Sequence, residues 1–183
     1  MPENRSRYAV LGALTLGPMS GYDLKQFMDG SVRHFWSESF GQIYPILRRL
    51  ESEELVTRES PSPAGRRERI VYTITEAGRE ALGRWVVEPA RDQVGRVEVL
   101  LKLFFARNGP PGTAEGLLRA FRTEHVTRLE RYAALEHDLR TARSTFVDLP
   151  FWLATLSYGQ HSSAALVAWC DQSLAALAAP QSD

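Results

Sequence analysis

The residues best placed to do chemistry lie in one short stretch, residues 39–51, where glutamine, tyrosine and paired arginines alternate with aliphatic side chains. Ile43, Leu47 and Leu50 recur at helical spacing and predict one apolar face. The opposite face of the same helix carries Gln42, Pro45, Arg48, Arg49 and Ser52. Glutamine can pair with adenine and arginine with guanine in the DNA major groove, and both can hold phosphate. The alternative is an ordinary amphipathic helix with a solvated charged face.

Sequence patterns typical of enzymes are missing. The chain has no His-Glu-x-x-His, Gly-x-Ser-x-Gly, phosphate-binding or dinucleotide-binding glycine motif. Its histidines, which are His34, His125, His137 and His161, are not paired at metal-ligand spacing. Cys170 has no basic neighbour in the sequence that would lower the pKa of its thiol, so we expect a small buried side chain. We therefore expect no catalytic residues, no metal site and no cofactor, and a protein that is not an enzyme.

Composition limits where nucleic acid could bind. The 183 residues are 44% hydrophobic and 24% charged, which is typical of a globular protein. There are 22 basic and 22 acidic residues, so the net charge is zero. Residues 1–91 hold 13 basic and 12 acidic side chains, and residues 92–183 hold 9 and 10. DNA binding would therefore depend on a local basic cluster.

The sequence also bears on the compartment. No run approaches the roughly 18 apolar residues needed to cross a bilayer, and the first residues contain no apolar signal segment. The single cysteine excludes an internal disulfide. We expect a cytoplasmic protein with no membrane association.

Three helices are predicted first. Residues 7–17 are apolar on nearly every side and predict a buried helix that ends at Gly17. Ser20 with Asp23 predicts a capping box at the start of the second helix. The third helix should begin near Gly41, because Pro45 is tolerated only in a first turn, and should end between residues 52 and 54.

A β-hairpin is predicted next. Residues 56–60 and 70–74 read as strands, and residues 61–65 are turn formers. Arg66, Arg67 and Arg69 lie at or near its tip. Thr75 should cap a further helix that ends before Pro89. The side chains of this helix that should face the core are Ala77, Ala81, Leu82, Trp85 and Val86. Residues 1–91 therefore predict a winged helix-turn-helix, in a fold that is mainly α with a small two-stranded β wing. Such a wing can grip phosphate or an adjacent minor groove.

These residues resemble the PadR family of bacterial transcriptional regulators. The resemblance covers about residues 6–90 and rests on residues 11–17, Ser20-Gly21-Tyr22-Asp23-Leu24, Gly41-Gln42-Ile43-Tyr44-Pro45-Ile46-Leu47-Arg48-Arg49-Leu50-Glu51, Leu55-Val56, Tyr72-Thr73-Ile74-Thr75 and Gly78-Arg79. Residues 92–183 resemble, mainly in layout, the longer helical domain of the Vir-like branch.

The resemblance implies a homodimeric repressor bound to a palindromic operator in double-stranded DNA. Half-sites would then lie about 34–36 Å apart, or a multiple of this. Gln42, Tyr44 and Arg48 are candidates for base or groove-edge contact, and Tyr22, Arg49, Arg66 and Arg67 for phosphate contact. Ser39 and Pro45 complete the predicted DNA-binding surface.

One position departs from the family. The family commonly has glycine just before the Leu55-Val56 pair, where this chain has Glu54. Glycine there closes the helix in the left-handed conformation, which costs glutamate roughly 1 kcal/mol. We therefore expect a turn of different build, or a helix that runs on.

Residues 92–183 predict a helical dimerisation domain. Residues 97–106 are apolar almost all round and should be buried in a core or between subunits. Thr113 should cap a helix that reaches about residue 144, roughly 45 Å long. Such a length favours packing on a helix of the other subunit. The alternative is an intramolecular hairpin with the final helix, residues 151–177, whose interleaved small residues permit close packing.

Several aromatic residues could line an apolar effector site between domains or subunits. The candidates are Trp85, Phe104, Phe105, Trp152, Tyr158, His161 and Trp169. The alternative for each is an ordinary core position. A small hydrophobic or aromatic effector would thus regulate DNA binding. Two other functions stay open, a winged-helix module that binds proteins and a small-molecule sensor without direct operator binding.

Overall fold

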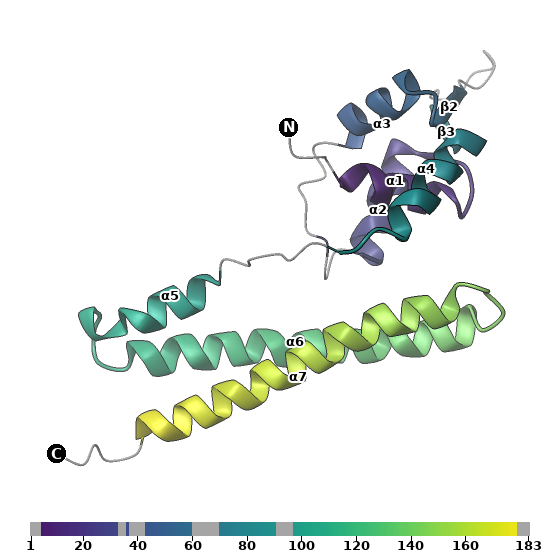
Figure 1. Cartoon of the computed structure of the whole chain (residues 1–183). Helices are drawn as coiled ribbons and strands as arrows, with labels where there is room; N and C mark the ends of the chain where they lie inside the picture. Colours follow the sequence, from purple (N-terminus) through teal and green to yellow (C-terminus); the bar gives the residue numbers. More distant parts are fainter. Residues whose placement is uncertain (1–4, 33–35, 37–42, 60–69, 91–96, 179–183) are drawn as a thin grey trace, which may run out of the picture. The chain divides into compact units, whose positions relative to one another are not determined.

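Helices dominate both halves of the chain (Figure 1). The computed structural model describes residues 5–32, 36, 43–59, 70–90 and 97–178. The chain divides into two compact units, Met1–Asp92 and Gln93–Asp183. Among the described residues, none of the helices combines the length and the apolar character that crossing a membrane requires.

In the described part of the first unit, four helices surround one aliphatic core. They are α1 (Ser6–Leu14), α2 (Gly21–Gly30), α3 (Ile43–Ser52) and α4 (Glu76–Val86). α1 packs against each of the other three, which explains why it is apolar on nearly every side. The buried side chains come from helices and strands alike, and they include Val10, Leu11, Leu14, Leu24, Met28, Ile43, Ile46, Leu47, Leu50, Val56, Tyr72 and Ile74.

The sheet has one strand more than the sequence predicts. β2 (Val56–Glu59) and β3 (Val71–Ile74) form the expected antiparallel pair, with Val56 opposite Ile74. β1 (Met19–Ser20) adds to the other edge of β3, which makes the order β1-β3-β2. Two residues are too few to show the alternation by which a strand is recognised in a sequence.

Helix caps test the local predictions directly. The capping box at Ser20 and Asp23 is present, and the Thr75 hydroxyl accepts from the Gly78 N–H at 3.0 Å at the start of α4. The predicted cap at Thr113 is wrong. Thr113 is already the first residue of its helix, the cap is Gly112 in the left-handed conformation, and the Thr113 hydroxyl donates to the Pro110 carbonyl at 2.6 Å.

Not every predicted inward side chain of α4 is buried. Val86 is exposed, as is Ala77. Gly78 is the buried residue of this helix. A Cβ atom added to it would lie 2.2 Å from the Leu55 carbonyl oxygen, so no larger residue fits there. The close approach of α4 to the turn before β2 therefore explains the glycine.

The second unit is a helical hairpin with a short helix before it. α5 (Glu98–Phe104) and the 3₁₀ turn η2 (Ala106–Asn108) precede α6 (Thr113–Ala142) and α7 (Leu149–Ala178). α6 and α7 lie side by side and antiparallel along most of their length (Figure 1). The long helix thus packs on the last helix of its own chain, which was the alternative to packing on the other subunit.

A seven-residue spacing runs through the α6–α7 seam. Leu118, His125 and Tyr132 are buried on α6, and Leu156, Ser163 and Cys170 on α7. This spacing keeps one face of each helix against its partner. Tyr132 packs on Gly159, where an added Cβ would lie 2.9 Å from the tyrosine Cζ atom.

Candidate nucleic-acid interface

α3 has the two unlike faces that its sequence predicts. Its core side is made by Ile43, Ile46, Leu47 and Leu50, all buried. Its other side exposes Tyr44, Pro45, Arg48, Arg49 and Ser52. The tyrosine and arginines on the exposed side can contact a ligand while the aliphatic residues on the other side stay packed in the core.

The start of α2 contributes a second exposed aromatic residue. Tyr22 follows directly after the capped first residue of α2, and 52% of its surface is exposed. Its hydroxyl accepts a hydrogen bond from the Gln26 amide at 2.7 Å. Tyr44 of α3 is 59% exposed, and its ring lies against Gly21. The starts of α2 and α3 are therefore joined at this surface.

The end of α3 is closed by a left-handed residue, Glu54, with a φ of 57°. The Leu55 N–H donates to the Leu50 carbonyl at 2.9 Å, and the Glu54 N–H donates to the Glu51 carbonyl at 3.0 Å. These two bonds define a Schellman motif. The expectation of a different turn or a longer helix is therefore wrong, because Glu54 adopts the conformation that the family's glycine would have.

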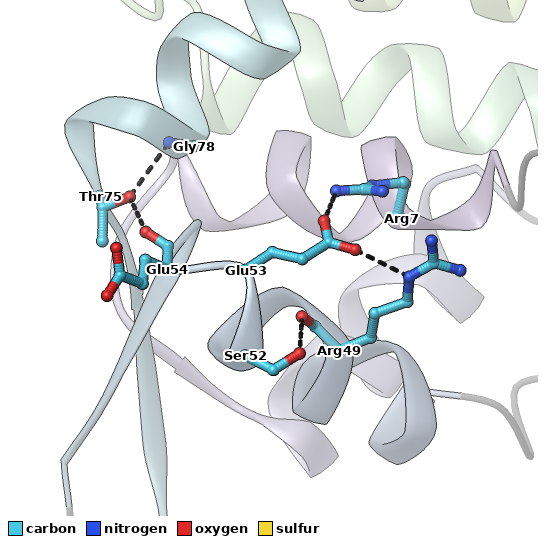
Figure 2. Close-up of polar contacts among 7 residues, drawn as sticks. All are labelled: Arg7, Arg49, Ser52, Glu53, Glu54, Thr75 and Gly78. Carbon is cyan, nitrogen blue, oxygen red and sulfur yellow. Dashed lines mark hydrogen bonds and ion pairs between the residues drawn. The ribbon is translucent and has the colours of Figure 1, made fainter.

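Thr75 ties this turn to α4 (Figure 2). Its hydroxyl donates to the Glu54 carbonyl at 2.8 Å while it accepts from the Gly78 N–H. The Thr75 N–H also donates to the Leu55 carbonyl at 3.1 Å. One side chain thus caps α4 and satisfies a carbonyl at the end of α3. The sequence reveals only the capping role.

A shared carboxylate lies beside the same turn (Figure 2). Glu53 accepts from the Arg49 Nε at 2.8 Å and pairs with Arg7 of α1. Burial raises the pKa of the Glu53 carboxyl, but the hydrogen bonds from Arg49 and Arg7 outweigh burial, so the pKa lies below its usual value. The spacing of four residues could have revealed the Arg49–Glu53 pair, whereas no sequence signal points to Arg7.

The predicted DNA-contacting residues fall into two groups. Tyr22, Tyr44, Pro45, Arg48 and Arg49 are exposed in the first unit. The other four lie outside the described residues, and they are Ser39, Gln42, Arg66 and Arg67. Arg58 of β2 is an exposed cation that the sequence pattern does not single out.

The candidate effector residues lie in different places. Trp85 belongs to the first unit and stacks on Tyr8, with ring centroids 4.6 Å apart. In the second unit, Phe104 is 80% exposed and meets Phe105 edge-on. Tyr158 and His161 are also exposed, and the His161 Nδ1 lies 2.8 Å from the Ser157 carbonyl oxygen.

The two tryptophans of α7 belong to separate clusters. Trp152 lies beside Phe146, with the Arg143 guanidinium over both rings. Trp169 meets Phe121 of α6 edge-on at 6.2 Å. Trp169 lies seventeen positions after Trp152 in the same helix, which is roughly 25 Å along the axis. They therefore do not line one small pocket together.

His125 is a buried polar residue that the sequence pattern does not flag. Its Nδ1 lies 3.2 Å from the Ser163 hydroxyl of α7, Phe121 packs on its ring, and its Nε2 has no hydrogen-bond partner in the described part of the chain. Burial lowers the pKa of His125, and the charge of Arg128 lowers it further. The spacing of seven residues from Leu118 could have revealed this position.

The two units match two family sequence models in order. The transcriptional regulator PadR-like family matches residues 10–84, and the virulence activator alpha C-terminal family matches residues 96–178. The probable transcriptional regulator Rv1176c of Mycobacterium tuberculosis is 30% identical over 151 residues, which are 77% of each chain. The chain belongs to the PadR family.

Other PadR proteins extend the comparison. The negative transcriptional regulator PadR of Bacillus subtilis is 34% identical over 101 residues, so the alignment spans about half of each chain, 54% of this one and 55% of that one. A crystal structure of the B. subtilis protein with operator DNA has a TM-score of 0.83 and 25% identity, and the match covers 96% of this chain and 98% of that one. A structure of the same protein with p-coumaric acid has a TM-score of 0.75 and 24% identity, covering 98% and 99%.

The PadR comparison confirms the predicted fold class. The chain is a PadR-family transcriptional regulator with an N-terminal winged helix-turn-helix and a C-terminal helical part, and the sheet of the former has three strands. The curated PadR-family relatives are named as transcriptional regulators.

Proposed function

We propose that this chain is a homodimeric repressor that binds a palindromic operator and responds to a small hydrophobic or aromatic effector. Residues 1–91 bind DNA, and residues 92–183 form the dimer and receive the effector. α3 enters the major groove, where Tyr44 and Arg48 face bases or groove edges and Arg49 and Tyr22 face phosphate.

The observation that carries this proposal is the exposed strip of α3. Aromatic and cationic side chains face outward along the helix while four aliphatic residues hold it to the core. Tyr22 extends the strip from α2. The B. subtilis PadR with operator DNA, whose fold this chain shares, supports the placement.

The first experiment is binding to duplex DNA taken from directly upstream of the protein's own gene, with scrambled DNA as the control. A specific regulator should prefer the upstream DNA by about 10³ or more at physiological salt. Equal and strongly salt-dependent binding to both DNAs would place the operator elsewhere or require an effector. Absence of binding at low salt would favour the protein-interaction function instead.

The wing makes a separate prediction. Replacing Arg66 and Arg67 together with alanine should weaken binding to all DNA about equally and reduce the salt slope by about 2, since each phosphate contact contributes roughly 0.9. The control is the double alanine variant of Arg119 and Arg131, two exposed arginines of α6. An unchanged slope in the wing variant, measured by fluorescence anisotropy at several salt concentrations, would exclude the wing contact.

The effector is tested with p-coumaric acid, the compound held by the B. subtilis protein. Trp152 and Trp169 are half-buried on α7 and can report binding by quenching of fluorescence without DNA. The proposal expects quenching together with weaker operator binding. If neither p-coumaric acid nor other small aromatic acids change operator affinity, the effector part of the proposal is wrong.

The dimer is supported by the surface of α5. Leu100, Leu101, Phe104 and Phe105 are exposed, although their sequence pattern is that of a buried helix. Of the two predicted burial sites for this segment, the one between subunits fits an apolar helix that the other helices of the second unit leave uncovered.

A further inference from the structure

Gly21, the first residue of α2, is buried, and the exposed residue Tyr44 of α3 lies against it. The point where a Cβ atom would stand on Gly21 lies 2.7 Å from Cε1, 3.0 Å from Cζ and 3.2 Å from the hydroxyl oxygen of Tyr44. These are the three nearest atoms, and all belong to one side chain. The Tyr44 ring thus occupies the space that any larger residue at position 21 would need.

Backbone geometry does not explain this glycine. Left-handed φ angles among the described glycines occur at Gly17 and Gly112, whereas Gly21 lies in regular helix after its cap. Alanine is favoured over glycine inside helices by up to about 1 kcal/mol. Helix propensity thus disfavours glycine at position 21, and its contact with Tyr44 explains why glycine is there.

We propose that Gly21 is a positioning residue for DNA recognition, because it lets Tyr44 of α3 lie flat against the start of α2. The inference rests on the proposed DNA-binding function. The contact fixes the direction of the Tyr44 hydroxyl at the start of α2, one residue before the exposed Tyr22, so that both helices contribute a tyrosine to the DNA-binding surface. A ring held before binding loses less side-chain freedom when DNA arrives.

A side chain at position 21 should therefore affect binding without harming the fold. The atoms that would collide are at the outer end of a tyrosine whose side chain is largely exposed. Tyr44 can rotate away into solvent, while the backbone of α2 gains helix propensity. Folding and recognition are thus separable at this residue.

The test is a double-mutant cycle in the full-length protein with Gly21→Ala and Tyr44→Ala. Gly21→Ala should bind the operator roughly tenfold more weakly, the size of one lost polar contact, with an unchanged or higher melting temperature. In the Tyr44→Ala background, Gly21→Ala should have no further effect on affinity. Gly12→Ala is the matched control, because nothing lies within 4 Å of an added Cβ in α1.

Each other result overturns the inference. Unchanged affinity in Gly21→Ala would mean that the ring needs no positioning, and additive losses in the double variant would mean that Gly21 acts through another group. A melting temperature that falls by several degrees in Gly21→Ala but not in Gly12→Ala would assign the glycine to the fold. If the wild-type protein binds no DNA at low salt, the proposed function fails as well, whereas failure of the inference alone leaves wild-type binding intact.

Discussion

Glu54 occupies a backbone conformation that suits glycine. A left-handed L-residue is disfavoured by roughly 1–2 kcal/mol. Here three hydrogen bonds depend on the turn, two from the backbone to Leu50 and Glu51 and one from the Thr75 hydroxyl. Each contributes about 1 kcal/mol net, so together they outweigh the strain. The interactions around the turn decide its shape against the local preference of its residue.

Glu54→Gly should therefore stabilise the protein. Relief of the left-handed strain is partly offset by the greater freedom of glycine in the unfolded chain, which leaves a gain of up to about 1 kcal/mol. Chemical denaturation measures the free energy of unfolding. Glu54→Ala is the control, because it removes the same carboxylate but keeps the Cβ, and it should show no such gain. Equal stability of the two variants would argue against strain at this residue.

The α6–α7 hairpin carries buried polar groups along its apolar seam. His125 is 4% exposed and Ser163 is 3% exposed, and the His125 Nδ1 lies 3.2 Å from the Ser163 hydroxyl oxygen across the seam. Such groups favour one register of the two helices over neighbouring ones. They also make the hairpin sensitive to pH, because a buried imidazole with a lowered pKa resists protonation.

The hairpin should lose stability in mild acid. In the unfolded chain His125 binds a proton near its ordinary pKa of 6.5, whereas in the folded chain its pKa is lower. The unfolded state thus binds more protons below that pH, so the free energy of unfolding falls as the pH drops from about 7 to 5.5. His125→Gln should reduce this dependence, measured by thermal unfolding at several pH values.

The exposed His137 of α6 provides the control for this measurement. His137→Gln should keep the pH dependence of the wild-type protein. If both variants behave alike, the acid sensitivity arises at some other group, and burial of His125 does not determine it.

At the scale of the whole molecule, α5 presents an apolar surface that α6 and α7 of the second unit do not cover. Leu101 is 62% exposed and Phe104 is 80% exposed. Burial of such side chains contributes about 25 cal/mol for each Å² of apolar surface. A second copy would cover this surface in the proposed dimer.

Charging that surface should separate the subunits. Leu101→Glu with Phe104→Glu is expected to give a folded monomer in sedimentation equilibrium, since neither side chain belongs to a core. Operator affinity should fall by about 10² or more, because one half-site no longer assists the other. Arg107→Glu adds negative charge at an exposed position nearby and should remain dimeric. A dimeric double variant would place the interface on another surface.

Local rules account for what could be predicted from the sequence. The apolar face of α3, the capping box of α2, the cap of α4 and the strands of the hairpin each depend on residues within a few positions of one another. The exposed strip with Tyr44, Arg48 and Arg49 follows from the same spacing. The order of these elements also predicts the winged-helix fold. The residues that resemble PadR proteins predict the family.

The tertiary structure decided those conformations and contacts that depend on a residue distant in the chain. β1 is a strand only because β3 lies beside it, and Glu54 is left-handed only because Thr75 and the end of α3 hold it. The pairing of Glu53 with Arg7, the contact of Tyr44 with Gly21 and the choice of α7 as the partner of α6 have the same origin. Periodicity shows which face of an element is apolar, but the residue that covers this face is set by packing in three dimensions.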